Sequence, residues 1–284
     1  MILRNSYPDR LYCMGEKSTL SSQNNLIKFG ILLTLALVWG SSFMLMKKAL
    51  LVFSPLQVGL LRMGIAGLAL LPLSLRYLYK ARKKKNYPWK TLVLASMTGN
   101  LGPAILFPLA IANTKSSAIV GILNATTPLF TLIIGAVLYR APIGRWRSGG
   151  IALGLLGATI LVAMNSGHLE WPDGFALLVL GATFCYGLNL NLIKNQLSGL
   201  KAMEIASIAL CMAMLPAWII FFGFTEQPTG WWMSSTGWEA LAFLTVLGVV
   251  GTALALLLFF SLLKFASPLF ASSVTYMIPV VALL

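Results

Sequence analysis

The chain has 284 residues, of which 58% are hydrophobic and 10% are charged, with 21 Lys plus Arg against 7 Asp plus Glu. This composition excludes an ordinary soluble domain, and because the basic residues lie mostly between long apolar runs, it favours membrane orientation over nucleic-acid binding. The three cysteines form no CxxC pair and the single histidine, His168, has no neighbour at metal-ligand spacing, so neither a metal site nor a cofactor is expected.

Nine apolar runs reach or approach the roughly 20 residues that a helix needs to cross the hydrocarbon core. A polar segment, residues 1–27, precedes them, and the first run is too long for the core of a cleavable signal peptide, so it is predicted to be a retained span. Turn and charge signals separate the runs. In chain order, the predicted helices cover residues 28–47, 57–78, 91–112, 116–138, 148–164, 173–194, 202–224, 240–263 and 268–284.

The basic residues predict the orientation, because short loops rich in Lys and Arg stay in the cytoplasm. With the N-terminus in the cytoplasm, 17 of the 21 Lys and Arg lie in cytoplasmic segments, and seven of these lie between Arg76 and Lys90. Four of the seven acids fall on the outer side. The sequence therefore predicts a multi-pass protein of the plasma membrane or bacterial inner membrane, with residues 1–27 in the cytoplasm.

Two internal matches indicate two copies of one unit. The segment WGSSFMLMKK from Trp39 matches YGLNLNLIKN from Tyr186 at an offset of 147, and SSAIVGILNATTPLF from Ser116 matches SPLFASSVTYMIPVV from Ser267 at an offset of 151. A unit of five helices would place the second copy upside down in the membrane. The same offset predicts a tenth helix that ends near residue 315, so we expect about 31 residues carrying that helix to be missing.

Four segments resemble the EamA family of the drug/metabolite transporter superfamily: WGSSFMLMKKAL from Trp39, LLRMGIAGLALLPL from Leu60, the run from Asn124 to Val162, and ASSVTYMIPVVALL at the end. The resemblance covers nearly the whole chain from Lys28. It implies an all-α, polytopic transmembrane bundle of two inverted five-helix repeats, here residues 28–164 and an incomplete second repeat, residues 173–284. It also implies a central substrate cavity and export of small metabolites.

Two basic residues are candidates for substrate binding, because an ionisable side chain inside a span costs roughly 2.5 to 3.5 kcal/mol at the helix centre and is retained mostly for function. Arg62 lies inside the second predicted helix, and Lys47 lies at the outer end of the first. The family resemblance supports both. The alternative is that each side chain reaches the outer headgroups and only anchors its helix.

Proline inside a span frees the carbonyl four residues earlier, and such backbone should face protein or a cavity. Pro128 frees the carbonyl of Asn124, and its repeat mate Pro279 frees that of Thr275. These kinks predict a mid-membrane site between the repeats, although the polar groups beside them also suit simple helix–helix hydrogen bonds. Besides Arg62 and Lys47, the candidates are Trp39, Ser42, Asn124, Thr127, Pro128, Tyr186, Asn189, Thr275 and Tyr276, with Asn100, Pro103 and Pro108 as weaker ones.

The predicted spans contain no acid well inside the membrane, and only Glu204, two residues into the seventh helix, could reach inward. Because carriers of organic cations commonly use an intramembrane carboxylate, we expect the substrate to be a small neutral, zwitterionic or anionic, amino-acid-like metabolite. The resemblance implies that a secondary transporter exports it, and two repeats suit alternating access. The spans hold no nucleophile–base pair and no cluster of metal ligands, so an enzyme is not expected.

The expected partners are the lipid bilayer and a small-molecule metabolite. Nucleic acid is not expected, and a homodimer is left open. The alternative function is that of a truncated, non-transporting membrane protein or interaction partner.

Overall fold

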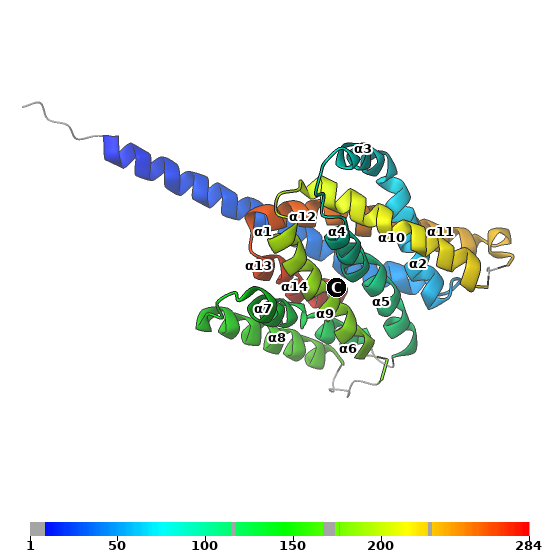
Figure 1. Ribbon diagram of the computed structural model, residues 1–284. Helices are drawn as coiled ribbons and strands as arrows, with labels where there is room; N and C mark the ends of the chain where they lie inside the picture. The colour runs from blue at the N-terminus through cyan, green and yellow to red at the C-terminus, as the bar shows by residue number, and fades with distance from the viewer. Residues whose placement is uncertain (1–8, 115–116, 167–173, 176, 227–228, 284) are drawn as a thin grey trace, which may run out of the picture.

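The computed structural model describes residues 9–114, 117–166, 174–175, 177–226 and 229–283, and every regular element in these residues is helical. The helices pack into one bundle, from which the N-terminal part of α1 projects (Figure 1). Six of the described helices are long and apolar enough to cross a membrane, and a seventh crossing is added if the bent pair α2 and α3 is one span. The chain is therefore a polytopic, all-α membrane bundle, as its composition predicts.

Nine helical regions among the described residues match the nine predicted spans, mostly to within a few residues. In chain order they are α1 (Asp9–Ala49); α2 (Pro55–Ala69) with α3 (Leu71–Arg82); α4 (Trp89–Ser96) with the π-helix η1 (Met97–Leu101) and α5 (Gly102–Asn113); α6 (Ser117–Asn124) with α7 (Thr127–Tyr139); α8 (Arg145–Ser166); α9 (Leu177–Gln196); α10 (Ala202–Phe224); α11 (Ser235–Gly248) with the π-helix η3 (Val249–Leu254) and α12 (Ala255–Phe265); and α13 (Pro268–Ser272) with α14 (Val274–Leu283). A short 3-10 helix, η2 (Trp231–Met233), precedes α11. The predicted ends at residues 116, 173 and 284 lie outside the described residues.

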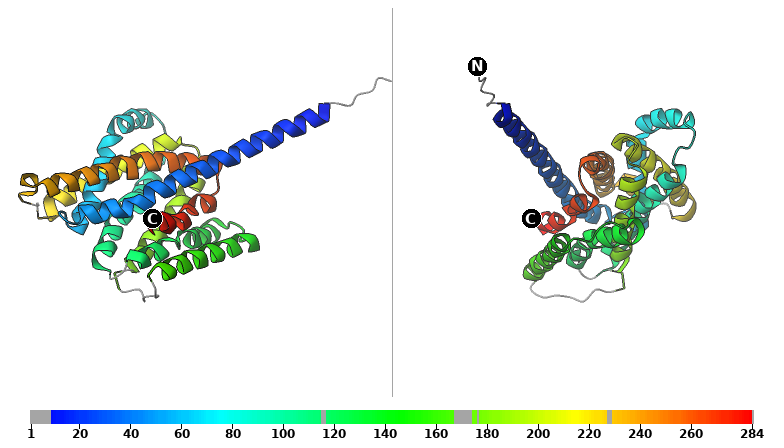
Figure 2. Two further views of the ribbon diagram at one scale, coloured as in Figure 1. Left: turned by 180° about the vertical axis from the view of Figure 1, so that it is seen from behind. Right: turned by 60° about the vertical axis from the view of Figure 1, so that its left-hand side comes forward.

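The first predicted span agrees with the apolar span Asn25–Ala49, although its helix is longer, and the second predicted span differs from the observed one. The first helix begins at Asp9 rather than near Lys28, because polar residues continue the helix beyond the apolar span, and its apolar part lies beside α11 and α14 (Figure 2). The second span is not one straight helix but bends by 68° between α2 and α3. Pro72, in the first turn of α3, has no N–H and its ring would clash with the carbonyl of Leu68, so the chain turns at Leu70.

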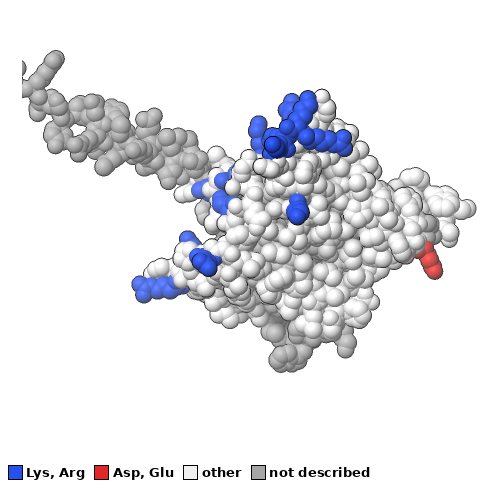
Figure 3. All heavy atoms as spheres, in the orientation of Figure 1, with Lys and Arg blue, Asp and Glu red and all other residues white. Residues whose placement is uncertain are grey.

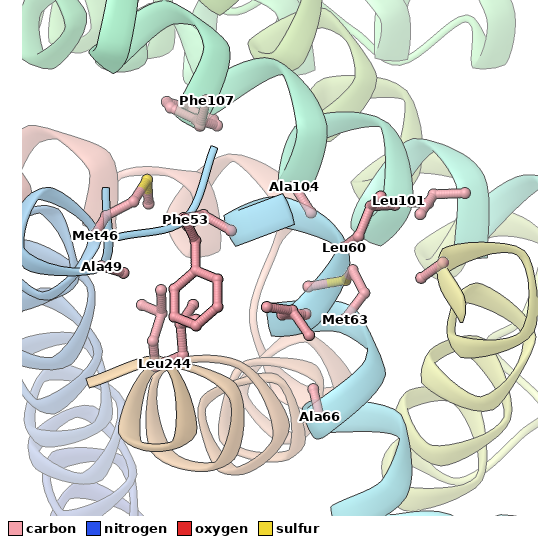
Figure 4. Packing of buried hydrophobic residues seen from close by; sticks show 14 of the residues in the cluster. Met46, Ala49, Phe53, Leu60, Met63, Ala66, Leu101, Ala104, Phe107 and Leu244 are labelled. Atoms are coloured by element: carbon pink, nitrogen blue, oxygen red, sulfur yellow. The ribbon is translucent and has the colours of Figure 1, made fainter. Parts of the chain in front are cut away.

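The helix α2 lies at the centre of the larger apolar cluster, between α5, α10 and α11 (Figure 4). Its small residues allow close approach: a Cβ on Gly59 would overlap the backbone carbonyl of Ala104, and one on Gly67 would overlap the side chain of Met214. Close backbone packing of this kind is the main source of helix association in lipid, where there is no hydrophobic force between helices. It holds α2, and with it Arg62, in a fixed position.

Basic side chains gather over α3 and at the end of the bundle from which α1 emerges (Figure 3). At this end, Lys194 Nζ donates hydrogen bonds to the carbonyls of Leu263 and Ala266, at 3.2 and 3.1 Å. Lys264 Nζ donates in return to the carbonyls of Leu197 and Ser198, at 3.3 and 2.9 Å. Each lysine thus satisfies carbonyls at or just beyond the C-terminal end of the other's helix, and the ends of α9 and α12 are held together.

Glu204 is buried at the same end, near the start of α10. The hydroxyl of Tyr87 donates a hydrogen bond to Glu204 Oε1 at 2.8 Å, and Lys84 Nζ lies 3.9 Å from the same oxygen. Burial and this hydrogen bond raise the pKa of Tyr87, so the phenol keeps its proton at neutral pH. Glu204 therefore has its interaction partners, Tyr87 and Lys84, at the N-terminal end of α10. It does not line the cavity described below.

Candidate substrate cavity

A cavity of about 120 Å³ lies inside the bundle, where residues of α1, α2, α5, α6, α7, α9, α12, α13, α14 and the two π-helices meet. Its volume is close to that of the roughly 150 Å³ cavities that hold benzene, so a small organic molecule fits. Six aromatic side chains contribute to the wall: Trp39, Phe43, Phe107, Tyr186, Phe259 and Phe260.

The structure brings eight of the eleven predicted site residues together in this lining. They are Trp39, Ser42, Arg62, Asn124, Thr127, Tyr186, Asn189 and Thr275. They come from six helices, α1, α2, α6, α7, α9 and α14, and five of the eight are buried while Trp39, Arg62 and Tyr186 are half-buried. Their role in substrate binding stays a prediction, but they occupy one site.

The other three predicted residues lie outside the lining. Lys47 is exposed near the end of α1. Pro128 is buried beside the cavity, and the Asn124 carbonyl accepts a hydrogen bond from the hydroxyl of Thr127 at 2.8 Å. The hydroxyl of Tyr276 donates to the carbonyl of Ile151 at 3.2 Å, which directs this side chain toward α8.

Several lining residues were not selected from the sequence, and the internal repeat is the signal that finds them. At an offset of 152, each lining residue of η1 and α5 corresponds to one of η3 and α12: the pairs are Gly99 and Gly251, Asn100 and Thr252, Ala104 and Leu256, and Phe107 and Phe259. The first and sixth predicted helices contribute Trp39 with Tyr186, Ser42 with Asn189, and Phe43 with Leu190 at an offset of 147. Asn124 with Thr275 and Thr127 with Ile278 follow at 151. Most of the wall is thus built from matching positions.

The two π-helices occupy equivalent places in this pattern, and each interrupts a long span beside the cavity. In η1, the N–H of Gly102 bonds to the carbonyl of Met97, five residues earlier, and Pro103 follows. Because a proline cannot donate its own N–H and crowds the preceding turn, the wider π turn accommodates it. Such turns are frequent at functional sites, and here they contribute Gly99, Asn100, Gly251 and Thr252 to the wall.

Hydrogen bonds fix the half of the cavity around η3. Arg62, the one charged side chain in the lining that the structure describes, donates from Nε to Thr252 Oγ1 at 2.7 Å. The Thr252 hydroxyl donates to the carbonyl of Leu247 at 2.9 Å, and Trp39 Nε1 donates to the carbonyl of Gly251 at 3.1 Å. This half therefore presents a positioned guanidinium to the cavity.

The half around η1 has polar atoms without partners. Both side-chain polar atoms of Asn100 and the Oδ1 of Asn189 are buried and make no hydrogen bond within the protein. The Asn189 amide packs directly on Gly99, where a Cβ would overlap it. By contrast, Asn191 on the same helix donates to the carbonyls of Thr131 and Gly187, at 3.0 and 2.8 Å. Because unpartnered buried amides are costly and rare, Asn100 and Asn189 are suited to meet water or a ligand.

Comparisons with known proteins agree over most of the chain. The model of the family described as EamA-like transporters matches residues 28–163 and 174–284. The inner membrane transporter YedA of Escherichia coli, itself described as uncharacterized, is 28% identical over 265 residues, which is 90% of this chain and 80% of YedA. The same match holds for YedA of the O6:H1 and O157:H7 strains. A crystal structure of another protein has the same fold, with a TM-score of 0.68 and 18% identity over 92% of this chain and 86% of that one.

Proposed function

The chain belongs to the EamA-like transporter family and is a multi-pass membrane transporter, and we propose that it exports a small neutral, zwitterionic or anionic, amino-acid-like metabolite. One observation carries this choice of substrate. The cavity inside the bundle holds Arg62 and, among its described lining residues, no acid. A cation in this low-dielectric space would be repelled by the guanidinium without a counter-ion, whereas an anionic group would pair with it.

The proposed mechanism is alternating access between two inverted repeats, residues 28–164 and 173–284. The support is the wall of the cavity, where most residues come in pairs at offsets of 147 to 152. A site formed by both repeats opens to one side and then to the other when one repeat rocks against its partner. The polar contacts between the ends of α9 and α12 would have to break in the state that opens toward that end.

The proposed orientation has the N-terminus and the basic end of the bundle in the cytoplasm, because short loops rich in Lys and Arg stay on that side. A variant without native cysteines that carries Lys84→Cys or Glu226→Cys tests it. In intact cells, a membrane-impermeant thiol reagent is expected to label the cysteine at position 226 and not the one at 84, while both react after the cells are opened. Labelling of position 84 alone in intact cells would reverse the orientation.

The substrate class is tested by counterflow with purified protein in liposomes that are loaded with unlabelled amino acids and take up labelled amino acids from the outside, where the competitors are added. Counterflow is expected to be inhibited by unlabelled zwitterionic and anionic amino acids and not by a lipophilic cation such as tetraphenylphosphonium, because Arg62 repels a cation. Liposomes without protein are the control. Selective transport of the cation would contradict the proposed substrate class, and the absence of protein-dependent flux for every compound would contradict export of an amino-acid-like metabolite.

A further inference from the structure

We propose that the substrate spans the two halves of the cavity, with its anionic group at Arg62 and a neutral carboxamide-type group at Asn100 and Asn189. This inference rests on the proposed transport function and deepens it, because it names a second chemical feature of the substrate and the residues that recognise it. The carboxamide-binding residues come from η1 and α9, whereas the charge comes from α2.

The two halves of the cavity are built from matching positions but differ in their polar groups. Asn100 corresponds to Thr252, and Asn189 corresponds to Ser42. Thr252 donates to Leu247 and accepts from Arg62, and the hydroxyl of Ser42 donates to the carbonyl of Val38 at 2.7 Å. In the half around η3 these polar groups therefore have partners, whereas three polar atoms in the matching half have none.

The missing partner can be identified from the repeat. At an offset of 149, between the two offsets of the neighbouring helices, LLRM at 60–63 aligns with ALCM at 209–212, so Cys211 stands where Arg62 stands in the other half. Cys211 is buried in α10 and is not part of the described lining. No side chain of α10 reaches Asn100 as Arg62 reaches Thr252, and the space beside Asn100 remains part of the cavity.

The unpartnered atoms define the chemistry of the group that would fill this space. Asn100 offers N–H donors on Nδ2 and an acceptor on Oδ1, and Asn189 adds a second acceptor on its Oδ1. A carboxylate could satisfy only the donors and would face two carbonyl oxygens, while an ammonium group could satisfy only the acceptors. A carboxamide has one acceptor and two N–H donors in a single plane, so it can satisfy all three atoms.

The side of the cavity at Arg62 is suited to bind a carboxylate. The Nε of Arg62 is used by Thr252, and the guanidinium has four further N–H donors in a planar fork that matches the two oxygens of a carboxylate. A cavity of about 120 Å³ restricts a molecule that contacts both Arg62 and the two asparagines to roughly the size of one amino acid. A zwitterionic or anionic molecule with a short carboxamide arm has the required features.

The test uses the full chain and three amino acids of similar length: L-glutamine, L-glutamate and L-norleucine. Binding is measured as the ligand-dependent shift of thermal unfolding of the purified protein, and transport is measured as inhibition of counterflow in liposomes. We expect L-glutamine to bind and compete about 10- to 100-fold better than L-norleucine, because the latter leaves the buried amides unpartnered. L-glutamate is also expected to compete less well than L-glutamine.

Two variants assign the preference to its residues. Asn100→Leu and Asn189→Leu remove the hydrogen-bonding atoms but keep a side chain of four heavy atoms branched at Cγ, and they are expected to reduce the preference for glutamine over norleucine to about twofold or less. Asn195→Leu is the matched control on α9, because Asn195 is exposed and lies outside the lining; it is expected to keep the preference. The comparison of ligands on the unaltered protein does not depend on the variants folding.

Each outcome separates this inference from the proposed function. Transport without a preference for glutamine, or a preference that survives in both asparagine variants, overturns the inference and leaves the transporter proposal standing; the unpartnered amides then hold only water. A glutamine-specific shift of unfolding without any transport supports the inference and overturns the proposed export function. No binding of any of the three amino acids overturns the inference.

Discussion

Replacing Arg62 with Leu is expected to lower transport of the zwitterionic or anionic substrate by about 100-fold or more. The guanidinium is the one charge in the described cavity lining, so it is the group that would pair with the substrate's anionic group, and removal of one partner of such a desolvated, hydrogen-bonded charge pair typically costs about 2–5 kcal/mol. The measurement is the initial rate of counterflow in liposomes at equal protein content. Thr252 keeps its hydrogen bond to Leu247, so the variant is expected to fold, and gel filtration checks this.

Two control variants distinguish charge from position. Arg62→Lys keeps a positive charge but loses the planar donor that holds Thr252, so we expect intermediate transport. Lys48→Gln removes a basic residue that is exposed, one helix away and outside the lining, and is expected to transport normally. If the Leu variant transports at the rate of the unaltered protein, Arg62 only anchors its helix, and the assignment of the anionic group to this residue is wrong.

Replacing Gly59 with Ala is expected to destabilise the protein, with a loss of about 1–3 kcal/mol or more in the free energy of unfolding. The added methyl group would overlap the backbone carbonyl of Ala104, and the backbone atoms of α5 cannot move aside as a flexible side chain can. The helices α2 and α5 would have to separate. Thermal unfolding in detergent measures the effect, and we expect a clearly lower midpoint together with a reduced yield of folded protein.

Gly157→Ala is the matched control for this experiment. Gly157 lies on α8, and a Cβ at this position meets no atom within 4 Å. Alanine favours a helix by about 1 kcal/mol over glycine, so this variant is expected to be as stable as the unaltered protein or slightly more stable. Equal midpoints for the two alanine variants would show that α2 and α5 do not approach as closely as described.

The helices were predictable from the sequence because crossing a membrane sets a minimum apolar length, and apolar length can be read directly. The bend at Leu70 was missed because an apolar run does not report direction, and Pro72 lies close enough to the predicted end to look like a terminus. The polar start of α1 was missed for a related reason. Hydropathy detects the part of a helix that lies in lipid, but it does not indicate how far the helix continues beyond the membrane.

The candidate site was partly predictable because polar residues and prolines inside spans are few and carry a physical cost. That reasoning found Arg62, Asn124 and Asn189, which all lie at the cavity. It did not select Thr252 or Phe259, since threonine and phenylalanine are ordinary residues of apolar helices. Thr252 is marked only by its repeat partner Asn100, whereas Phe107 and Phe259 are both ordinary and neither marks the other. The direction of the Tyr276 side chain could not be predicted, because it depends on the hydrogen bond to α8.

The two π-helices also bear on where the chain can gain or lose a residue without moving the cavity wall. Loops at the surface can gain or lose codons without moving the cavity wall. Inside the spans that hold η1 and η3, however, the loss of a codon from regular α-helix would rotate everything that follows by about 100°, whereas the loss of one within a π turn would restore a regular α-helix and leave that rotation nearly unchanged. A loss between Gly102 and Phe107, beyond η1, would therefore turn Phe107 away from the cavity. The two π-helices begin 152 residues apart, at matching positions of the two halves, which is what the duplication of a half-gene that already carried the extra residue would produce.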